Sequence, residues 1–586
     1  MALFQQGRLK QAEKALLHLE ERHPGIPDVL HLLGFICLEN GRPGPAAEYL
    51  EGAVEAVPSS AEMLNLLGIA QHDLGRNGEA LKSLEKAVSL QQQHTLARFN
   101  LANVLRDLER LEDAATQLEA VVALKPDFAD AQYNLGLTRK QLGAPEAAIP
   151  CYEAALGLEP DNPETWNSLA AALLALERWD EAEEKLGKAQ ALAPDMPGIH
   201  CNLGILQKAR GELIEAERHF RRALDLEPDL AIAHGDLGVT LRVLGRYEEA
   251  EISLLRAIEL APDKPDNHTN LALLYLLTGK EESGWKEYEW RWRQPKFKPR
   301  PFPQPLWDGS DLSAKTILCW GDEGVGDEVL FSSQIPGIIK RAAHCIVECA
   351  PRLVPMFKRA FPAAEVVPRT DDPDPRLMGH GIDFHSPFTS LVRWTLPKLK
   401  AGRRPDAPYL FVDPAIGGKL KTRYTDFGDA LKIGISWASG NRARPERNLP
   451  LALWRPILTQ PGCRFISLQY GDHATEIAET QEKFGIEIYV DKDVDQLQSL
   501  EDFAAQISAL DLVITISCTT AHMSGALGQN VWTMLPFATD YRYQLHRTDS
   551  PWYPNMRLFR QERAGEWLTA IEQVSQELVL KTEKPK

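Results

Sequence analysis

A period of 34 residues is the feature that most limits what this chain can fold into. A proline, or once a glutamine, marks the period eight times; a leucine stands nine residues after each marker, and glycine or alanine follows that leucine. Repeats of this length are pairs of antiparallel helices, which must stack on their neighbours because one pair cannot bury its apolar face alone. The period therefore predicts a stacked helical superhelix. The markers are Pro24, Pro58, Gln92, Pro126, Pro160, Pro194, Pro228 and Pro262.

Small residues at fixed positions of the repeat indicate close packing between helices. Alanine recurs twenty-two residues after seven of the markers, and Gly284 takes the eighth place. The pattern resembles the tetratricopeptide repeat (TPR), and the resemblance implies that the array holds another polypeptide. The first pair, over residues 1–23, carries no obvious cap, and the sequence leaves open whether Met1 is the true start.

The repeats also resemble those of the protein O-GlcNAc transferases. In that family, an asparagine before the Leu-Gly pair lines the inner groove and contacts the backbone of the acceptor peptide. The matching residues here imply an acceptor-peptide groove, with ordinary surface polarity as the alternative. They are Asn100, Asn134, Asn202 and Asn270, whereas Leu32, Leu66, Ser168 and Asp236 depart from the pattern.

Charge and cysteine usage narrow the class of protein. A formal net charge of −17 argues against general nucleic-acid binding, which needs a basic surface. The eight cysteines form no CxxC pair and no metal-like spacing, which is typical of a reducing cytoplasm. We expect no signal peptide and no membrane span, because no apolar run is long enough.

The period ends after Pro262, and the sequence then changes character. We expect a TPR superhelix over 1–294, a Pro-rich basic linker over 295–312, and two α/β regions over 313–415 and 430–580. Short β-branched runs alternate with helical stretches there, a pattern typical of parallel sheets, so two Rossmann-like halves with a cleft between them are predicted. The predicted strands are 316–320, 345–349, 365–368, 432–437, 464–469, 486–490, 512–516, 531–535 and 556–559.

The loop over 321–328, directly after a predicted strand, holds two glycines between acidic residues. Its acidity makes a phosphate an unsuitable ligand, whereas a carboxylate at the mouth of a cleft suits a general base. Asp327 is the candidate. The equally weighted alternative is that Asp327 and Glu328 complement the dipole of the helix that follows.

Two further loops contain polar residues suited to phosphate. Three arginines follow the strand 432–437 in one short loop: Arg442, Arg444 and Arg447. Guanidinium groups pair bidentately with phosphate oxygens, although a solvated charge run is the commoner explanation. Ser517, Thr519, Thr520 and His522 lie between the strand 512–516 and a helix of small residues, whose start offers unpaired N–H groups. Cys518 beside His522 is rejected as a nucleophile, because nothing else completes such a site.

The second half of the chain, from about 315 to 578, resembles the heptosyltransferase-type glycosyltransferases of GT-B fold. Residues 324–327 resemble that family's Gly-Asp loop, whose aspartate is the presumed base, and 511–528 resemble its donor-binding loop. The resemblance implies a GT-B catalytic region with Asp327 as base and a donor site at Arg442, Arg444, Ser517, Thr519, Thr520 and His522. Ser517 stands where the family usually has aspartate, which puts donor geometry and activity in question.

The whole arrangement resembles bacterial TPR glycosyltransferases, some of which modify flagellin in the cytoplasm with a nucleotide-activated nonulosonic acid. The hypothesis is an inverting, metal-independent protein O-glycosyltransferase that needs no cofactor, with a nucleotide-sugar donor, possibly CMP-linked, and a protein acceptor held by the repeats. The alternatives are a TPR adaptor with a degenerate second half and a glycosyltransferase of cell-surface polysaccharide. The sequence does not identify the nucleotide, the sugar, the acceptor protein or the oligomeric state.

Overall fold

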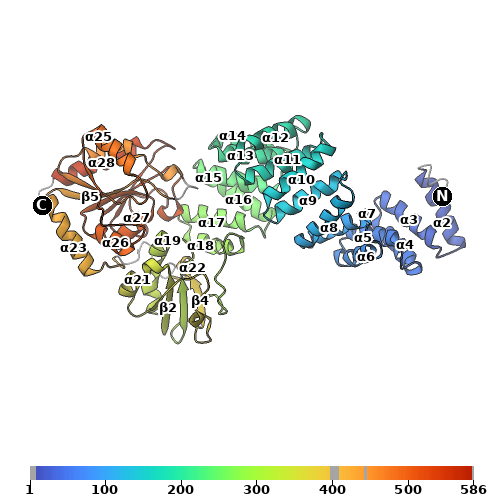
Figure 1. The fold of residues 1–586 in the computed structure, drawn as a ribbon, viewed down its shortest axis with the longest axis horizontal. Helices are drawn as coiled ribbons and strands as arrows, with labels where there is room; N and C mark the ends of the chain where they lie inside the picture. The colour runs from blue at the N-terminus through green and yellow to red at the C-terminus, as the bar shows by residue number, and fades with distance from the viewer. Residues whose placement is uncertain (1–7, 396–407, 441–444, 584–586) are drawn as a thin grey trace. The chain divides into compact units, whose positions relative to one another are not determined.

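A computed structural model describes residues 8–395, 408–440 and 445–583 of the chain. By contacts between residues, the chain divides into two compact units, 1–236 and 237–586. Figure 1 shows stacked helices from α2 onward and, in the second unit, parallel strands with helices packed around them. The structure is therefore a long helical repeat array followed by a region of parallel sheets, as the sequence predicts.

The first unit consists of helices of nearly uniform length, and its last helix, α15, runs across the boundary into the second unit. A proline in the first turn starts several of these helices, where its fixed φ suits the helix and its missing N–H is not needed. The helices are α2 (Leu9–Arg22), α3 (Pro27–Glu39), α4 (Pro43–Ala56), α5 (Ala61–Asp73), α6 (Asn77–Leu90), α7 (Thr95–Asp107), α8 (Leu111–Leu124), α9 (Ala129–Gln141), α10 (Pro145–Leu158), α11 (Pro163–Ala175), α12 (Trp179–Leu192), α13 (Pro197–Ala209), α14 (Leu213–Leu226) and α15 (Ala231–Val243).

The small residues of the repeat lie where helices approach closely. The periodic alanines, Ala148 among them, are fully buried. A Cβ added at Gly136 would lie 2.6 Å from a ring carbon of Tyr152, and one added at Gly204 would lie 2.6 Å from a ring carbon of Phe220. The large side chain of the second helix therefore occupies the space that glycine leaves in the first. This confirms the packing predicted from the sequence.

The turn inside each repeat needs a left-handed backbone. Gly143 and Gly211 adopt φ of +77° and +84°, which glycine tolerates without steric cost. Where the repeat lacks this glycine, Glu109 and Glu177 adopt φ of +58° and +57° instead. The turn geometry is thus imposed by the helix pair even where the local sequence disfavours it.

Among the described residues of the second unit, ten parallel strands form two sheets, one in the order β3-β2-β1-β4 and one in the order β10-β9-β8-β5-β6-β7. Neighbouring strands end together: Trp320 of β1 lies opposite Glu348 of β2 and Pro387 of β4. The strands are β1 (Thr316–Trp320), β2 (His344–Cys349), β3 (Glu365–Pro368), β4 (Phe384–Pro387), β5 (Leu431–Ser436), β6 (Cys463–Ser467), β7 (Ile488–Tyr489), β8 (Leu512–Ile516), β9 (Val531–Leu535) and β10 (Met556–Arg560).

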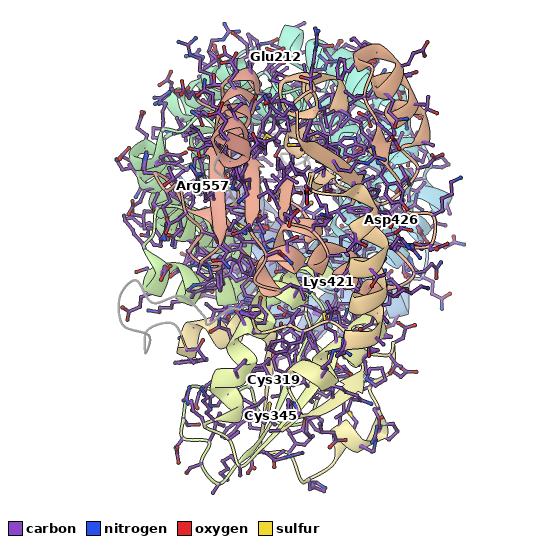
Figure 2. All side chains as sticks on the ribbon, turned by 90° about the vertical axis from the view of Figure 1, so that its left-hand side faces the viewer. Glu212, Cys319, Cys345, Lys421, Asp426 and Arg557 are labelled. Atoms are coloured by element: carbon purple, nitrogen blue, oxygen red, sulfur yellow. The ribbon has the colours of Figure 1, made fainter. Side chains whose placement is uncertain are left out.

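Helices connect the strands and cover the sheets, as parallel pairing requires. Buried side chains such as Cys319 and Cys345, on adjacent strands β1 and β2, fill the interior (Figure 2). These helices are α19 (Val325–Phe331), α20 (Ile335–Ile339), α21 (Val354–Ala360), α22 (Phe388–Thr395), α23 (Pro414–Tyr424), α24 (Arg455–Leu458), α25 (Ala474–Phe484), α26 (Leu500–Ser508), α27 (Thr519–Ala526) and α28 (Leu568–Glu583). The second unit also holds the last repeat helices, α16 (Tyr247–Leu260), α17 (Pro265–Leu277) and α18 (Glu281–Tyr288).

Every strand predicted from the sequence is present within a few residues, and one strand was missed. β4 reads Phe-His-Ser-Pro and has neither the β-branched residues nor the apolar run that mark most of the other strands. It pairs with β1 along the edge of the first sheet, where a terminal proline costs no ladder hydrogen bond. Tertiary pairing, rather than local propensity, defines this strand.

The last repeat helices belong to the second unit, so the compact units divide earlier than the predicted change at 294/295. Trp285 and Tyr288 of α18 are buried in the same apolar core as Phe331 and Tyr541. The predicted linker also packs in part, because Phe302 is buried against Trp320. The aromatic residues after Gly284 therefore pack the last repeat against the sheets of the second unit.

Replacing Gly136 with alanine is expected to destabilise the array by about 1–3 kcal/mol, because the new Cβ would overlap the fully buried ring of Tyr152. Gly187 is the matched control. It lies inside α12 with no heavy atom within 4 Å of an added Cβ, so Gly187→Ala should stabilise by up to about 1 kcal/mol. Thermal unfolding with hydrogen exchange in α9 and α10 would measure both changes, and equal effects would contradict the packing described.

Candidate functional site

A cavity of about 310 Å³ lies in the second unit where the carboxyl ends of strands from both sheets meet. The loop after β1 and the start of α19 form one wall, with Gly324, Val325 and Gly326 among its residues. The opposite wall comes from the loops after β5, β8 and β9. Its residues are Ser439, Arg447, Ser517, Cys518, Thr519, His522, Asp540 and Arg542.

Glycine at position 326 allows the two walls to touch. A Cβ there would lie 3.0 Å from Thr519 Oγ1 and 3.4 Å from Thr519 Cα. The first turns of α19 and α27 therefore abut, one from each sheet. Cys518, the residue before α27, caps none of the helix's first N–H groups with its side chain, so the start of α27 faces the cavity without a side-chain cap.

Arg542 is the central cation of the cavity. Its guanidinium lies 2.5 Å from Asp327 Oδ1, 3.2 Å from Glu323 Oε2 and 2.9 Å from Asp540 Oδ1. Asp540 also pairs with Arg447 at 2.6 Å. One network of alternating charges thus joins the wall from the first sheet to the wall from the second.

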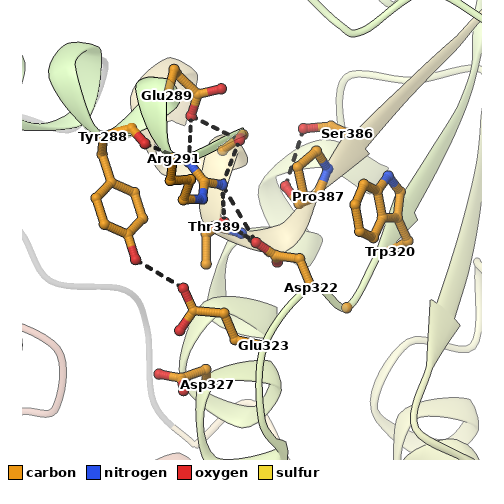
Figure 3. Close-up of polar contacts among 12 residues, drawn as sticks. Tyr288, Glu289, Arg291, Trp320, Asp322, Glu323, Asp327, Ser386, Pro387 and Thr389 are labelled. Atoms are coloured by element: carbon orange, nitrogen blue, oxygen red, sulfur yellow. Dashed lines mark hydrogen bonds and ion pairs between the residues drawn. The ribbon is translucent and has the colours of Figure 1, made fainter. Parts of the chain in front are cut away.

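A second, more deeply buried network holds the loop after β1 in place (Figure 3). Arg291 is fully buried and lies 3.4 Å from Asp322 Oδ2 and 3.0 Å from Glu289 Oε1. It also donates to the hydroxyls of Thr389 and Ser390 on α22. Without these partners the guanidinium of Arg291 would be an unpaired buried charge, which is costly. The network therefore holds the last repeat against the first sheet.

Burial raises the pKa of the carboxyl groups around this loop. It raises the pKa of Asp322 to about 6, against the opposing charge of Arg291. It also raises the pKa values of Glu323 and Asp327, each of which is raised further by a neighbouring carboxylate and lowered by Arg542. These groups therefore hold protons more tightly than ordinary surface carboxyls do.

His522 is neutral under ordinary conditions. Burial and the charge of Arg542 lower its pKa to about 3. Its Nδ1 lies 3.3 Å from the hydroxyl of Tyr553, and its ring stacks on Tyr543. His522 can thus form hydrogen bonds with a ligand, but it adds no positive charge to the cavity.

The structure brings together four of the site residues predicted from the sequence. Asp327, Ser517, Thr519 and His522 line the cavity. Thr520 does not, because consecutive helical residues point about 100° apart and its hydroxyl lies 3.5 Å from Ser436 Oγ in the interior. Arg442 and Arg444 lie outside the described residues.

The structure places two arginines in the cavity. Arg447 is one of the three arginines that the sequence offers for a phosphate, although it is absent from the predicted donor site, and Arg542 was not predicted at all. Arg542 and Asp540 follow β9, whose loop was not considered. The signal was available, since in parallel sheets the loops after neighbouring strands meet at one edge, and β9 is the neighbour of β8.

The predicted groove asparagines form hydrogen bonds between repeats. In the first unit, Asn100 donates to Asn65 Oδ1 at 2.9 Å and Asn202 donates to Asn167 Oδ1 at 2.8 Å. Asn134 accepts from Arg106 at 2.8 Å. Asn65 and Asn167 each lie one residue before the predicted position, which accounts for the departures at Leu66 and Ser168.

Asn270 lies in the second unit, on α17, and is partly buried. No contact described for this residue tests its predicted place in a peptide groove. It therefore stays a prediction that Asn270 contacts an acceptor.

A second cavity of about 490 Å³ adjoins the first and lies beside the last repeat helices. Glu323, Arg447, Asp540 and Arg542 line both cavities. Tyr288, Phe297 and Tyr541 add aromatic surface, and Leu273, Thr539, Asp322, Arg242 and Lys296 complete the lining. The charged network around Arg542 is therefore a partition that two cavities share.

Within residues 8–395, 408–440 and 445–583, no three His, Cys, Asp or Glu side chains are grouped so that they could hold a metal ion. In the same part of the chain, no helix combines the length and apolarity that crossing a membrane requires.

Comparison with known proteins identifies the repeats. Tetratricopeptide-repeat models match residues 1–60, 38–95, 102–143, 141–200 and 201–265. The chain therefore carries a TPR array in its N-terminal half. It is also 32% identical over 313 residues to Protein FlbA of Caulobacter vibrioides, a match that covers 50% of this chain and 52% of FlbA. The chain spans about half the length of this curated relative.

Solved TPR structures resemble parts of the chain. YrrB, described as a TPR protein with an unusual peptide-binding site, is 22% identical, with a TM-score of 0.29, over 32% of this chain and 97% of YrrB. A TPR protein from Parabacteroides merdae is 19% identical, with a TM-score of 0.38, over 45% of this chain and 99% of that protein. MamA from Desulfovibrio magneticus is 27% identical, with a TM-score of 0.27, over 28% of this chain and 94% of MamA.

Glu328 makes the stability of the second unit depend on pH. Its carboxylate is 1% exposed, pairs with Arg369 at 2.8 Å and accepts from the N–H of Ala350, yet burial raises its pKa from an ordinary value near 4.5 to about 7. A raised carboxyl pKa stabilises the folded state while the group is protonated. That stabilisation is lost as the pH rises from about 4.5 to about 7.

The wild type should therefore lose stability relative to Glu328→Gln as the pH rises from about 4.5 to about 7, because glutamine stays neutral. Chemical denaturation of both proteins across this range, monitored at the second unit, measures the difference. A difference that does not change with pH would contradict the assignment.

Proposed function

We propose that the chain is an inverting protein O-glycosyltransferase of GT-B type. The TPR array binds a protein acceptor, and the cavity around Arg542 binds a nucleotide-sugar donor. The observation that carries the proposal is the meeting of loops from both parallel sheets at one cavity, with a carboxylate, Asp327, on one wall and the cation Arg447 and the polar start of α27 on the other.

The strand orders support two Rossmann-like halves. Numbered along the chain, the first sheet runs 3-2-1-4 and the second runs 3-2-1-4-5-6, the order of doubly wound dinucleotide-binding folds. In such sheets ligands bind beyond the carboxyl ends of the strands, where the strand order reverses. That reversal lies at β1 and β4 in the first sheet and at β5 and β8 in the second, and loops from β1, β5 and β8 line the cavity.

The proposed reaction joins an acceptor oxygen to the anomeric carbon as the bond from that carbon to the phosphate breaks. The leaving phosphate gains charge in the transition state, and Arg447, Thr519 and the N–H groups at the start of α27 are placed to stabilise it. A carboxylate of the loop over 321–328 takes the proton of the acceptor hydroxyl, and Asp327 is the residue that the sequence assigns to this step. No step of this scheme uses a metal or a cofactor.

Ser517 is the observation that favours a second function, that of a non-catalytic TPR adaptor. It lines the cavity where the resembling family usually has aspartate, and it is 4% exposed. The adaptor hypothesis predicts that the cavity binds no nucleotide, so nucleotide binding separates the two functions.

The first test is thermal stabilisation of the full chain by CMP, UDP, GDP and ADP and by their sugars. A shift with one nucleotide supports a donor site and identifies the donor class, and CMP would favour a nonulosonic acid and flagellin as acceptor. No shift at millimolar ligand would overturn the proposal and favour the adaptor.

Asp327→Asn should lower sugar transfer by about 100-fold or more, because the predicted proton acceptor and a charge that fixes Arg542 are both lost. The matched control is Asp426→Asn, which changes an exposed aspartate of the same unit and should leave transfer unchanged. Transfer would be measured as labelled sugar in protein. Full activity of Asp327→Asn would contradict the assignment of this carboxylate to the site.

A further inference from the structure

Glu323 lies at the boundary between the two cavities, whereas Asp327 lines only the first. The side chain of Glu323 is 17% exposed, and it comes from the loop that joins β1 to α19. Its carboxylate therefore borders both the proposed donor cavity and the cavity beside the last repeat helices.

The other carboxylate that borders both cavities, Asp540, is more firmly neutralised. It pairs with Arg447 at 2.6 Å and with Arg542 at 2.9 Å, and it accepts from the backbone N–H of Arg542 at 3.0 Å. Within the part of the chain that the structure describes, Glu323 has one ion pair, to Arg542 at 3.2 Å, and one hydrogen bond, from the Tyr288 hydroxyl at 2.8 Å. Of the two, Glu323 is the better proton acceptor.

The second cavity has the composition of a peptide site. Aromatic rings of Tyr288, Phe297 and Tyr541 and the side chain of Leu273 offer apolar contact. A positive charge, on Lys296, and a negative charge, on Asp322, also line this cavity. At about 490 Å³ the cavity accommodates a serine or threonine with part of its flanking chain rather than a whole protein surface.

We propose that Glu323 is a catalytic residue of the transfer, the group that takes the proton from a serine or threonine hydroxyl entering through the second cavity. Asp327, in this scheme, holds Arg542 and receives no proton. The inference rests on the proposed glycosyltransferase function and divides between two residues the role that the sequence assigned to Asp327 alone.

The O–H bond of the acceptor breaks, and its proton passes to a carboxylate oxygen of Glu323. The acceptor oxygen forms the new bond to the anomeric carbon, and the bond from that carbon to the phosphate oxygen breaks with its electron pair on the nucleotide. Glu323 then returns the proton to solvent.

The surroundings of Glu323 set the pH at which it can act. Burial and the charge of Asp327 raise its pKa, whereas Arg542, the Tyr288 hydroxyl and Arg291 lower it. Asp322, Asp540, Arg447, Arg242 and Lys296 are the other charged groups that line the second cavity with it. Transfer should therefore fall on the acid side as Glu323 becomes protonated, and removing the Tyr288 hydroxyl should move that fall to higher pH.

The experiment uses the full chain with CMP-, UDP-, GDP- and ADP-sugars as donors and a library of serine- and threonine-containing peptides as acceptor. Glu323→Gln is expected to lower peptide-dependent kcat by about 100-fold or more and to remove the acid-side fall, whereas the exposed control Asp426→Asn should change neither. Formate should restore part of the activity of Glu323→Ala, which a purely structural role would not allow. Tyr288→Phe should move the acid-side fall to higher pH.

Each contrary result has one meaning. Wild-type kcat and an unchanged pH profile in Glu323→Gln would overturn the inference and leave the proposed function standing. Removal of the acid-side fall by Asp327→Asn, rather than by Glu323→Gln, would also overturn the inference alone. So would release of nucleotide by the wild type without any stimulation by peptide. A wild type that neither binds nor turns over any of the donors would overturn the proposed function and the inference together. If Glu323→Gln fails to fold, an unmoved profile in Tyr288→Phe overturns the inference.

Discussion

The ion pairs of Arg542 are the interaction on which the second unit's candidate site depends. This one guanidinium contacts Asp327 and Glu323 from the first sheet and Asp540 from its own loop. Buried charges are costly unless they are paired, so the loops that supply these carboxylates are held near Arg542. Burial raises the pKa values of Glu323 and Asp327 and these ion pairs oppose that rise, so they also influence which carboxylate accepts a proton.

A second buried cation, Arg291, performs a similar task between the last repeat and the first sheet. It lies in the helical turn η1 (Glu289–Arg293), directly after α18, and contacts Asp322 at the start of the β1 loop. Tyr288, three residues earlier, donates to Glu323. The final repeat is therefore part of the wall of the candidate site, which gives the proposed acceptor-binding array a physical connection to the proposed chemistry.

The resemblance to known proteins differs between the two parts of the chain. TPR models match most of the repeats, whereas the glycosyltransferase function proposed for the sheets rests on their strand order and on the residues of the cavity. Ser517, in the place of the usual aspartate, lines that cavity directly. Ser517 therefore offers a hydroxyl where the resembling family has a carboxylate, and the carboxylates that line this cavity come from the loops after β1 and β9.

The sequence by itself determined the repeats and nearly all the strands, because helix pairs repeat every 34 residues and buried parallel strands are short apolar runs. It also located Asp327, Ser517, Thr519 and His522, which follow such strands directly. Only the tertiary structure decided the rest. Arg542 lies 219 residues from Glu323 in the chain, and β4 is a strand only because β1 pairs with it. Contacts between distant loops leave no local pattern, so the charged partition between the two cavities appears only when the sheets are assembled.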